Sequence, residues 1–210
     1  MESVVFVHGI WMMGIDMSLL KKRVRQCGYK TYQFSYPTVR RSPEQNAKKL
    51  QQFVHNIESE KIHFIAHSLG GLVVRHLFAL YPQQAAGNVI TLGTPHSGSL
   101  IAMRLVRYRW GRLILGKSVH DGLLGGAPQW HAPNKLGVIA GIGRIGIGRF
   151  FARFREDNDG TVAVSETKIK GMADYLILDC AHMGFLFNKS VAKQVCAFLK
   201  TGHFTFPNKI

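Results

Sequence analysis

The sequence predicts an α/β protein with a mostly parallel sheet of about six strands and helices on both faces. Two observations favour this class. Short apolar, β-rich runs alternate along the chain with segments of helical spacing, and such alternation is typical of parallel sheets. The 210 residues are 46% hydrophobic and 19% charged, which indicates a globular protein. We therefore expect a single domain over residues 1–210.

The individual elements follow from the apolar patterns and from the residues that end them. The expected strands lie at residues 4–7, 31–34, 62–66, 89–92, 138–140 (or from 136) and 175–178. The expected helices lie at residues 17–27, 43–57, 69–80 and 189–199. Gly28 closes the first helix, Pro43 follows Ser42 as a first-turn proline follows a cap, and Pro82 ends the third helix.

Residues 94–133 do not fit this alternation. The segment carries Arg104, Arg107, Arg109 and Arg112, followed by glycines and Trp130, without a clean period. We expect a helix and a long excursion over one edge of the sheet, because long irregular loops in compact domains are often lids or binding loops. The segment is therefore a candidate lid.

The charge balance predicts an anionic partner. Lys and Arg number 27 against 12 for Asp and Glu, a formal net charge of +15. Such a surface attracts nucleic acid, phospholipid headgroups or acidic substrates, and does not choose among them.

The cysteines and the N-terminus favour a cytoplasmic protein. Cys27, Cys180 and Cys196 are odd in number and irregularly spaced, which predicts a reducing compartment without disulfides or a zinc site. The chain enters its first strand without a basic leader, and no uncharged apolar run approaches about 18 residues.

The strongest local signal is the stretch Phe-Ile-Ala-His-Ser-Leu-Gly-Gly at residues 64–71. A buried strand runs into Ser68, and a helix starts directly after it. A sharp strand-to-helix turn exposes the serine hydroxyl and needs small residues two positions before and after, here Ala66 and Gly70. Ser68 could instead be a simple N-cap, but a cap does not explain small residues on both sides.

With this motif the chain resembles the α/β-hydrolase superfamily, specifically small bacterial serine lipases and esterases that use Ala-His-Ser-x-Gly. Further segments resemble the family's oxyanion loop, strand end, acid loop and histidine loop at residues 5–10, 91–99, 158–162 and 181–184. The resemblance covers nearly the whole chain and implies a minimal α/β-hydrolase fold.

The resemblance implies a role for each matching residue. Ser68 would be the nucleophile, His182 its general base, and Asp159 the acid that orients the histidine. The backbone N–H groups of Ile10 and Leu69 would form the oxyanion hole. The neighbouring residues Trp11 and Met12 could line an acyl pocket.

Other residues compete for these roles. Asp157 is the main rival to Asp159, and the remaining acidic candidates are Glu166, Asp174 and Asp179. We expect His8 and His96 to support loops and His67 to pack beneath the turn. His203 lies beyond the last helix in a polar tail. Cys180 lies close to His182 in sequence, but a buried small hydrophobe describes it better than a catalytic thiol.

Two motifs between residues 141 and 155 lie outside the catalytic segments and are interpreted separately. The GxGxxG at residues 141–146 follows the fifth expected strand, whereas a dinucleotide site needs this turn at the first. Apolar residues alternate with Arg144, Arg149, Arg153 and Arg155. This alternation fits either an ordinary surface stretch or an element that lies on a lipid interface.

The expected function is that of a serine carboxylester hydrolase, an esterase or lipase, that cleaves esters with an apolar acyl chain through an acyl-enzyme. We expect a small-molecule or lipid ester substrate, no cofactor and no metal. Peripheral contact with anionic membranes through Arg-rich segments is an option, and nucleic acid is disfavoured. The alternatives are an acyltransferase on the same triad, or a non-catalytic basic protein that binds lipid or nucleic acid.

Overall fold

A six-stranded, all-parallel sheet forms the centre of the computed structural model, which describes residues 1–83, 87–143 and 154–205. The strand order is β2-β1-β3-β4-β5-β6. The strands are β1 (Ser3–Val7), β2 (Lys30–Phe34), β3 (Ile62–His67), β4 (Val89–Leu92), β5 (Leu136–Gly141) and β6 (Asp174–Leu178). The predicted fold class is confirmed, and each expected strand is present.

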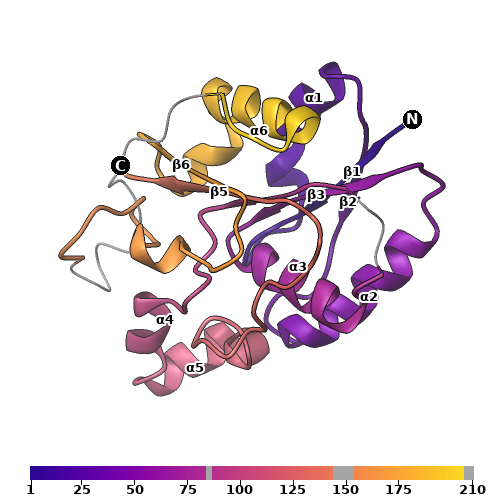
Figure 1. Ribbon diagram of the computed structural model, residues 1–210. Coiled ribbons are helices and arrows are strands. Elements are labelled where there is room, and N and C mark those ends of the chain that lie inside the picture. Colours follow the sequence, from indigo (N-terminus) through magenta and orange to yellow (C-terminus); the bar gives the residue numbers. More distant parts are fainter. Residues whose placement is uncertain (84–86, 144–153, 206–210) are drawn as a thin grey trace.

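Helices cover both faces of the sheet. The α-helices are α1 (Ser18–Gln26), α2 (Pro43–His55), α3 (Leu69–Leu80), α4 (Leu100–Leu105), α5 (Arg109–Leu115) and α6 (Lys189–Thr201). Short 3-10 helices lie at η1 (Ile15–Met17), η2 (Gly116–Val119), η4 (Ser165–Thr167) and η5 (Met183–Leu186). With the sheet seen nearly edge-on, α1 and α6 lie on one side and α2 and α3 on the other (Figure 1).

Local sequence explains where these helices begin. Ser42 and Gln45 form a reciprocal capping box at the start of α2, and Pro43 occupies its first turn. Asn188 caps α6 by accepting a hydrogen bond from the backbone N–H of Ser190 at 2.7 Å. At its other end, α6 stops at Gly202, which has a φ of 75°.

The strand side chains alternate between two apolar layers. In β1, Val4 and Phe6 pack in the layer under α1 and α6, whereas Val5 and Val7 pack in the layer under α2 and α3. All four are fully buried. Burial on both sides explains why this strand is an uninterrupted apolar run.

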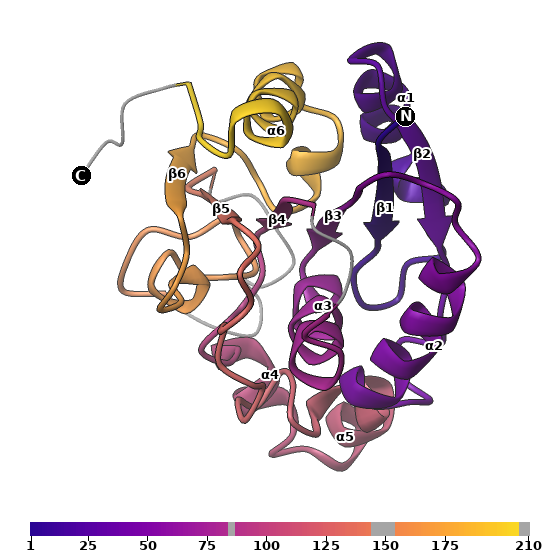
Figure 2. The same cartoon turned by 45° about the vertical axis from the view of Figure 1, so that its right-hand side comes forward.

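The candidate lid, residues 94–133, folds as two short helices, α4 and α5, followed by η2 and a long loop. Figure 2 shows both helices at one end of the molecule, close to α3 and α2. Leu69 and Leu72 at the start of α3 pack in one apolar cluster with side chains of this segment, namely Ile101, Ala102, Leu105, Leu115 and Leu123. The segment therefore has a core of its own against α3.

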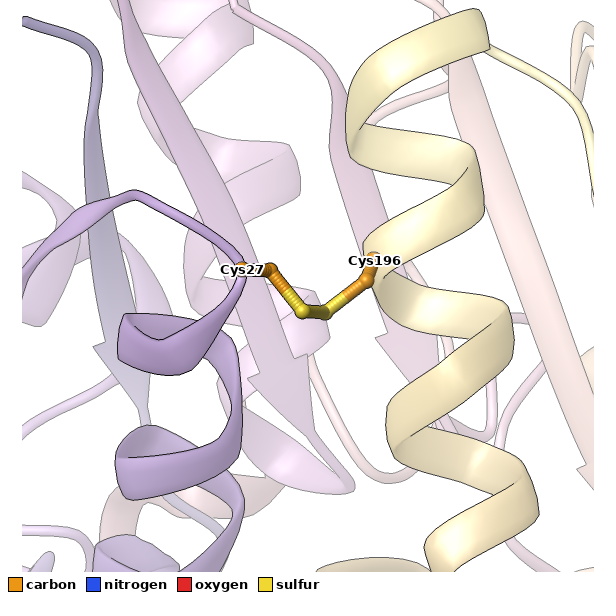
Figure 3. The surroundings of a disulfide bond; sticks show 2 residues. All are labelled: Cys27 and Cys196. Atoms are coloured by element: carbon orange, nitrogen blue, oxygen red, sulfur yellow. A yellow bond between two sulfur atoms is a disulfide. The ribbon is translucent and has the colours of Figure 1, made fainter.

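The expectation of three reduced cysteines is wrong for two of them. Cys27, which follows α1, forms a disulfide with Cys196 in α6 (Figure 3), and their Cα atoms are 6.3 Å apart. The residues are 169 positions apart in sequence, and they meet because α1 and α6 pack on the same face of the sheet. Cys180 is free and buried, as expected. The disulfide removes the cysteine argument for a reducing compartment, and a cytoplasmic location stays a prediction.

Within the described ranges, no helix is both long and apolar enough to span a membrane. The stretch at residues 141–155, for which an ordinary surface stretch and an interfacial element were both open, falls mostly on residues 144–153, which lie outside the described residues. The GxGxxG motif ends in the same part of the chain.

Candidate active site

Ser68 sits in a strained turn between β3 and α3. Its φ of 52° and ψ of −123° are rare for a residue with a side chain. Its N–H donates to the carbonyl oxygen of Leu92 at 2.9 Å, and its carbonyl accepts from Thr94 Oγ1 at 2.9 Å. Its side chain makes no capping hydrogen bond to α3, all of whose residues the structure describes. The simple N-cap interpretation of Ser68 is therefore wrong.

The glycines after Ser68 are required by close packing. A Cβ on Gly70 would overlap the carbonyl oxygens of Val7 and His8, and one on Gly71 would overlap the side chain of Thr94. Without side chains at these positions, α3 can start directly against the end of β1. This contact gives a physical reason for the small residue two positions after the serine.

Asp159 and His182 form a buried, hydrogen-bonded pair. His182 Nδ1 lies 2.7 Å from Asp159 Oδ2, and only 1% of Asp159 and 7% of His182 are exposed. The other carboxylate oxygen, Oδ1, accepts hydrogen bonds from the N–H groups of Thr161 at 2.9 Å and Val162 at 2.7 Å. The carboxylate is thus fixed in position and holds one nitrogen of the imidazole.

The rival acids Asp157 and Glu166 lie in different environments from Asp159. Asp157 is exposed. The carboxylate of Glu166 accepts from the N–H groups of Leu100 at 2.6 Å and Ala163 at 2.8 Å. Burial raises the pKa of Glu166, and its hydrogen bonds to these two N–H groups oppose that effect. Glu166 therefore ties the start of α4 to the loop that carries Asp159, and does not contact His182 through a described hydrogen bond.

Ser68 and His182 lie on the wall of one cavity of about 390 Å³. Its lining also includes Gly9, Ile10, Trp11, Met12, His67, Thr161, Ala181 and Met183. A smaller, mostly apolar cavity of about 70 Å³ adjoins Ser68 and is lined by α4 and α5 side chains such as Ile101 and Leu115. Among the described residues no hydrogen bond joins Ser68 Oγ to His182; such bonds often tighten only when substrate binds.

The loop after β1 lies beside Ser68. The N–H of Gly9 donates to Met12 Sδ at 3.3 Å, and the N–H of Trp11 donates to Thr38 Oγ1 at 3.2 Å. These bonds fix the backbone on either side of Ile10. The other oxyanion candidate, Leu69, is the first residue of α3.

The site lies at the switch point of the sheet. From β1 the chain moves to β2 on one side, and later returns to β3 on the other side of β1. The loops that follow β1 and β3 therefore diverge at the carboxyl ends of adjacent strands, where open parallel sheets bind ligands.

Several residues that support the site were not predicted from the sequence. Thr94 holds the backbone of Ser68, and the hydroxyl of Tyr36 donates to the carbonyl of His8 at 2.6 Å. A Cβ on Gly93, whose φ is 54°, would come within 2.8 Å of Asp159 Oδ2. Thr94 and Gly93 lie within the strand-end motif that the sequence analysis noticed, whereas nothing in the sequence pairs Tyr36 with His8.

Within the described ranges no group of three His, Cys, Asp or Glu residues is arranged to hold a metal ion. The absence of a metal or cofactor stays a prediction.

A family model matches residues 3–140, and the family is described as "Domain of unknown function (DUF7379)". The chain belongs to the DUF7379 family. In this DUF7379 protein, the matched region includes Ser68 and Ile10, whereas Asp159 and His182 lie beyond it. No curated protein is similar enough in sequence to count as a match.

Several solved structures share the fold of this DUF7379 protein. Over 94% of this chain and 90% of the other, it superposes on a lipase, BlEst2 from Bacillus licheniformis in mature form, with a TM-score of 0.71 and 18% identity. The metagenomic carboxyl esterase MGS0156 gives a TM-score of 0.70 at 20% identity, over 86% of this chain and 64% of that one. Phospholipase PlaB from Legionella pneumophila gives a TM-score of 0.67 at 20% identity, over 94% of this chain and 55% of that one. These likenesses show the α/β-hydrolase fold.

Proposed function

We propose that this protein is a serine carboxylester hydrolase that cleaves esters with an apolar acyl chain. The observation that carries the proposal is the placement of Ser68, in a strained turn, and His182, paired with Asp159, on the wall of one cavity. A strained serine after a strand, together with a buried Asp–His pair, is the arrangement that activates a hydroxyl nucleophile.

The reaction would proceed through an acyl-enzyme. Ser68 Oγ attacks the ester carbonyl carbon while His182 Nε2 accepts the hydroxyl proton. Asp159 keeps the proton on Nδ1 and stabilises the imidazolium. The C–O bond then breaks, and the alcohol leaves with the proton from His182. Water then attacks the acyl carbon while His182 Nε2 accepts its proton. The bond between the acyl carbon and Ser68 Oγ breaks, Ser68 takes the proton back from His182, and the carboxylic acid leaves.

The backbone N–H groups of Ile10 and Leu69 are the proposed donors to the oxyanion. The hydrogen bonds of Gly9 and Trp11 hold the first of them in place before substrate arrives. Losing one such donor typically costs about 2.7–4 kcal/mol of transition-state stabilisation.

The cavity walls support an apolar acyl group. Trp11 and Met12 line the larger cavity, and Trp11 with Leu123 lines the smaller one. The fold neighbours named as a lipase, a carboxyl esterase and a phospholipase agree with an ester substrate. An ester series of rising acyl length would locate the optimum.

A fluorophosphonate probe tests the proposal without knowledge of the natural substrate, since it reacts with activated serines. We expect the folded protein to be labelled, and both the Ser68→Ala variant and heat-denatured protein to remain unlabelled. Absence of labelling in folded protein, with or without detergent, would contradict the proposal and favour a non-catalytic binding protein. Product analysis with added alcohol separates hydrolysis from acyl transfer.

A further inference from the structure

Helix α5 presents apolar side chains to solvent. Trp110, Leu113 and Ile114 are exposed, and Leu113 is 80% exposed. At about 100° per residue these three positions form one stripe of the helix, while Gly111 and Leu115 are buried on another side. A surface helix of a globular protein normally buries its apolar stripe, so the outward exposure of Leu113 and Ile114 indicates an interaction surface.

The stripe continues onto the loop after β1. The indole N–H of Trp11 donates to the carbonyl oxygen of Ile114 at 3.0 Å, and nearby Met13 is 78% exposed. On the α5 side, the ring of Tyr108 stacks on that of Trp110. We call the six exposed residues Trp11, Met13, Tyr108, Trp110, Leu113 and Ile114 the apolar face.

The apolar face adjoins the candidate active site. Trp11 lines both cavities beside Ser68, and Leu115, on the inner side of α5, lines the smaller one. The loop after β1 and helix α5 therefore each contribute some side chains to the cavity wall and others to the outer surface. A partner seated on the apolar face would lie next to the cavity.

A cationic hollow borders the apolar face. Its volume is about 490 Å³, and five cations line it, of which Lys48 pairs with the carboxylate of Glu44 at 2.7 Å. The described lining residues are Arg40, Arg41, Gln45, Lys48, Lys49, Gln52 and Lys117. The N–H of Lys117, just after α5, donates to the carbonyl oxygen of Val39 at 2.8 Å. The hydroxyl of Thr38, which directly precedes Val39, accepts a hydrogen bond from the backbone N–H of Trp11. These bonds join the hollow to both parts of the apolar face.

We propose that the apolar face and the cationic hollow together dock on the surface of an anionic phospholipid bilayer. The apolar side chains enter the boundary between headgroups and acyl chains, and the hollow receives lipid phosphates. This places the mouth of the Ser68 cavity at the lipid surface. The docking surface gives the proposed esterase a source of substrate, but docking itself does not depend on catalysis.

A bilayer explains both features better than other occupants do. A second copy of this chain would carry the same formal charge of +15, and two such molecules repel. A nucleic acid would contact the cations through its phosphates but would leave the exposed Leu113 and Met13 without a partner. Only an anionic lipid surface offers phosphate and hydrocarbon side by side.

Vesicle flotation with the Ser68→Ala protein tests docking while lipid hydrolysis is blocked. We expect binding to phosphatidylcholine vesicles that contain phosphatidylglycerol, and much weaker binding to phosphatidylcholine alone. The Arg40→Gln/Arg41→Gln/Lys117→Gln variant should lose about 10²-fold in affinity, because each cation near an anionic surface contributes about fivefold. Leu113→Ser/Met13→Ser should also lose binding, with an unchanged melting temperature.

A matched control removes the same charge from the opposite side of the sheet. Lys22 in α1, and Lys189 and Lys200 in α6, are exposed; changing all three to Gln should leave vesicle binding close to that of the parent. An equal loss in the control would show a bulk charge effect and overturn the proposal. Absence of vesicle binding, or binding that survives the Leu113→Ser/Met13→Ser change, would also overturn it. Fluorophosphonate labelling with Ser68 intact, read separately, tests catalysis and not docking.

Discussion

Nε2 of His67 lies 3.1 Å from the backbone carbonyl oxygen of His182, and the two imidazole rings are 4.6 Å apart between centroids. A carbonyl oxygen only accepts hydrogen bonds, so Nε2 of His67 carries the proton. Burial and the neighbouring His182 hold the pKa of His67 well below its usual value. A neutral ring beside Ser68 thus fixes the backbone that carries the proposed base.

Replacing His67 with Leu should lower kcat for a soluble ester by between about tenfold and 10²-fold, because small displacements of a catalytic group are costly. KM should change less than kcat, because the lost hydrogen bond positions His182, although His67 also lines the cavity. His67→Gln keeps an N–H donor and should recover part of the lost kcat. Steady-state kinetics of both variants checks this; equal losses in the two variants would argue against a positioning role.

Asp159→Asn should reduce kcat by about 10⁴-fold, because an amide favours the wrong imidazole tautomer. Asp157→Asn serves as the matched control, since Asp157 is two residues away and exposed. It should retain most of the activity. The measurement is kcat/KM for both variants on one ester, and a larger loss in the Asp157 variant would reverse the assignment of the acid.

The strands could be predicted from the sequence because most of them are short apolar runs with turn residues beside them; β2, which contains Lys30 and Gln33, is the exception. β4 has the predicted bounds, 89–92, whereas β5 extends from Leu136 to Gly141. Its length is set by pairing with both neighbours, since Leu136 pairs with Val89 of β4 and Gly141 with Leu178 of β6. Such pairing depends on the assembled sheet and not on the local pattern.

The candidate site could be predicted only in part, because some of its contacts depend on the assembled fold and not on the local pattern. Ser68 carries a local signal, because its turn constrains the residues on either side. Asp159 and His182 were placed by resemblance and chain order, and their 2.7 Å contact is a tertiary fact. The disulfide was missed because its formation depends on the packing of α1 against α6, which no local pattern around Cys27 or Cys196 reveals.

Reduction of the disulfide should destabilise the protein. Loss of a native cross-link typically costs about 2–5 kcal/mol, because the unfolded chain gains freedom. Thermal unfolding with and without a phosphine reductant should show a lower melting temperature in the reduced sample. The Cys27→Ser/Cys196→Ser variant should melt at the same temperature under both conditions. An equal response of wild type and variant would mean that the cross-link does not form.

The free energy of unfolding should fall as the pH drops below about 6.5. Burial lowers the pKa of five histidines, so the folded protein binds fewer protons than the unfolded chain in this range: His8, His63, His67, His76 and His96. Protonation therefore favours unfolding. The raised pKa of Glu166 acts in the opposite direction, but it is a single carboxyl group.

Melting temperatures between about pH 7.5 and about pH 5.5 check this dependence, and we expect a fall of several degrees. His96 is 5% exposed, whereas His55 is exposed. His96→Gln should flatten the dependence, and His55→Gln should leave it unchanged. A melting temperature that rises towards acid would contradict the assignment.

The bond between Cys27 and Cys196 also closes a covalent ring that contains Ser68, Asp159 and His182. A protease that cuts the chain once inside this ring leaves a single covalent molecule, whereas the same cut after reduction leaves two fragments held only by packing. The pieces of the nicked, oxidised protein stay tethered at high local concentration, so the proposed triad could reassemble after unfolding.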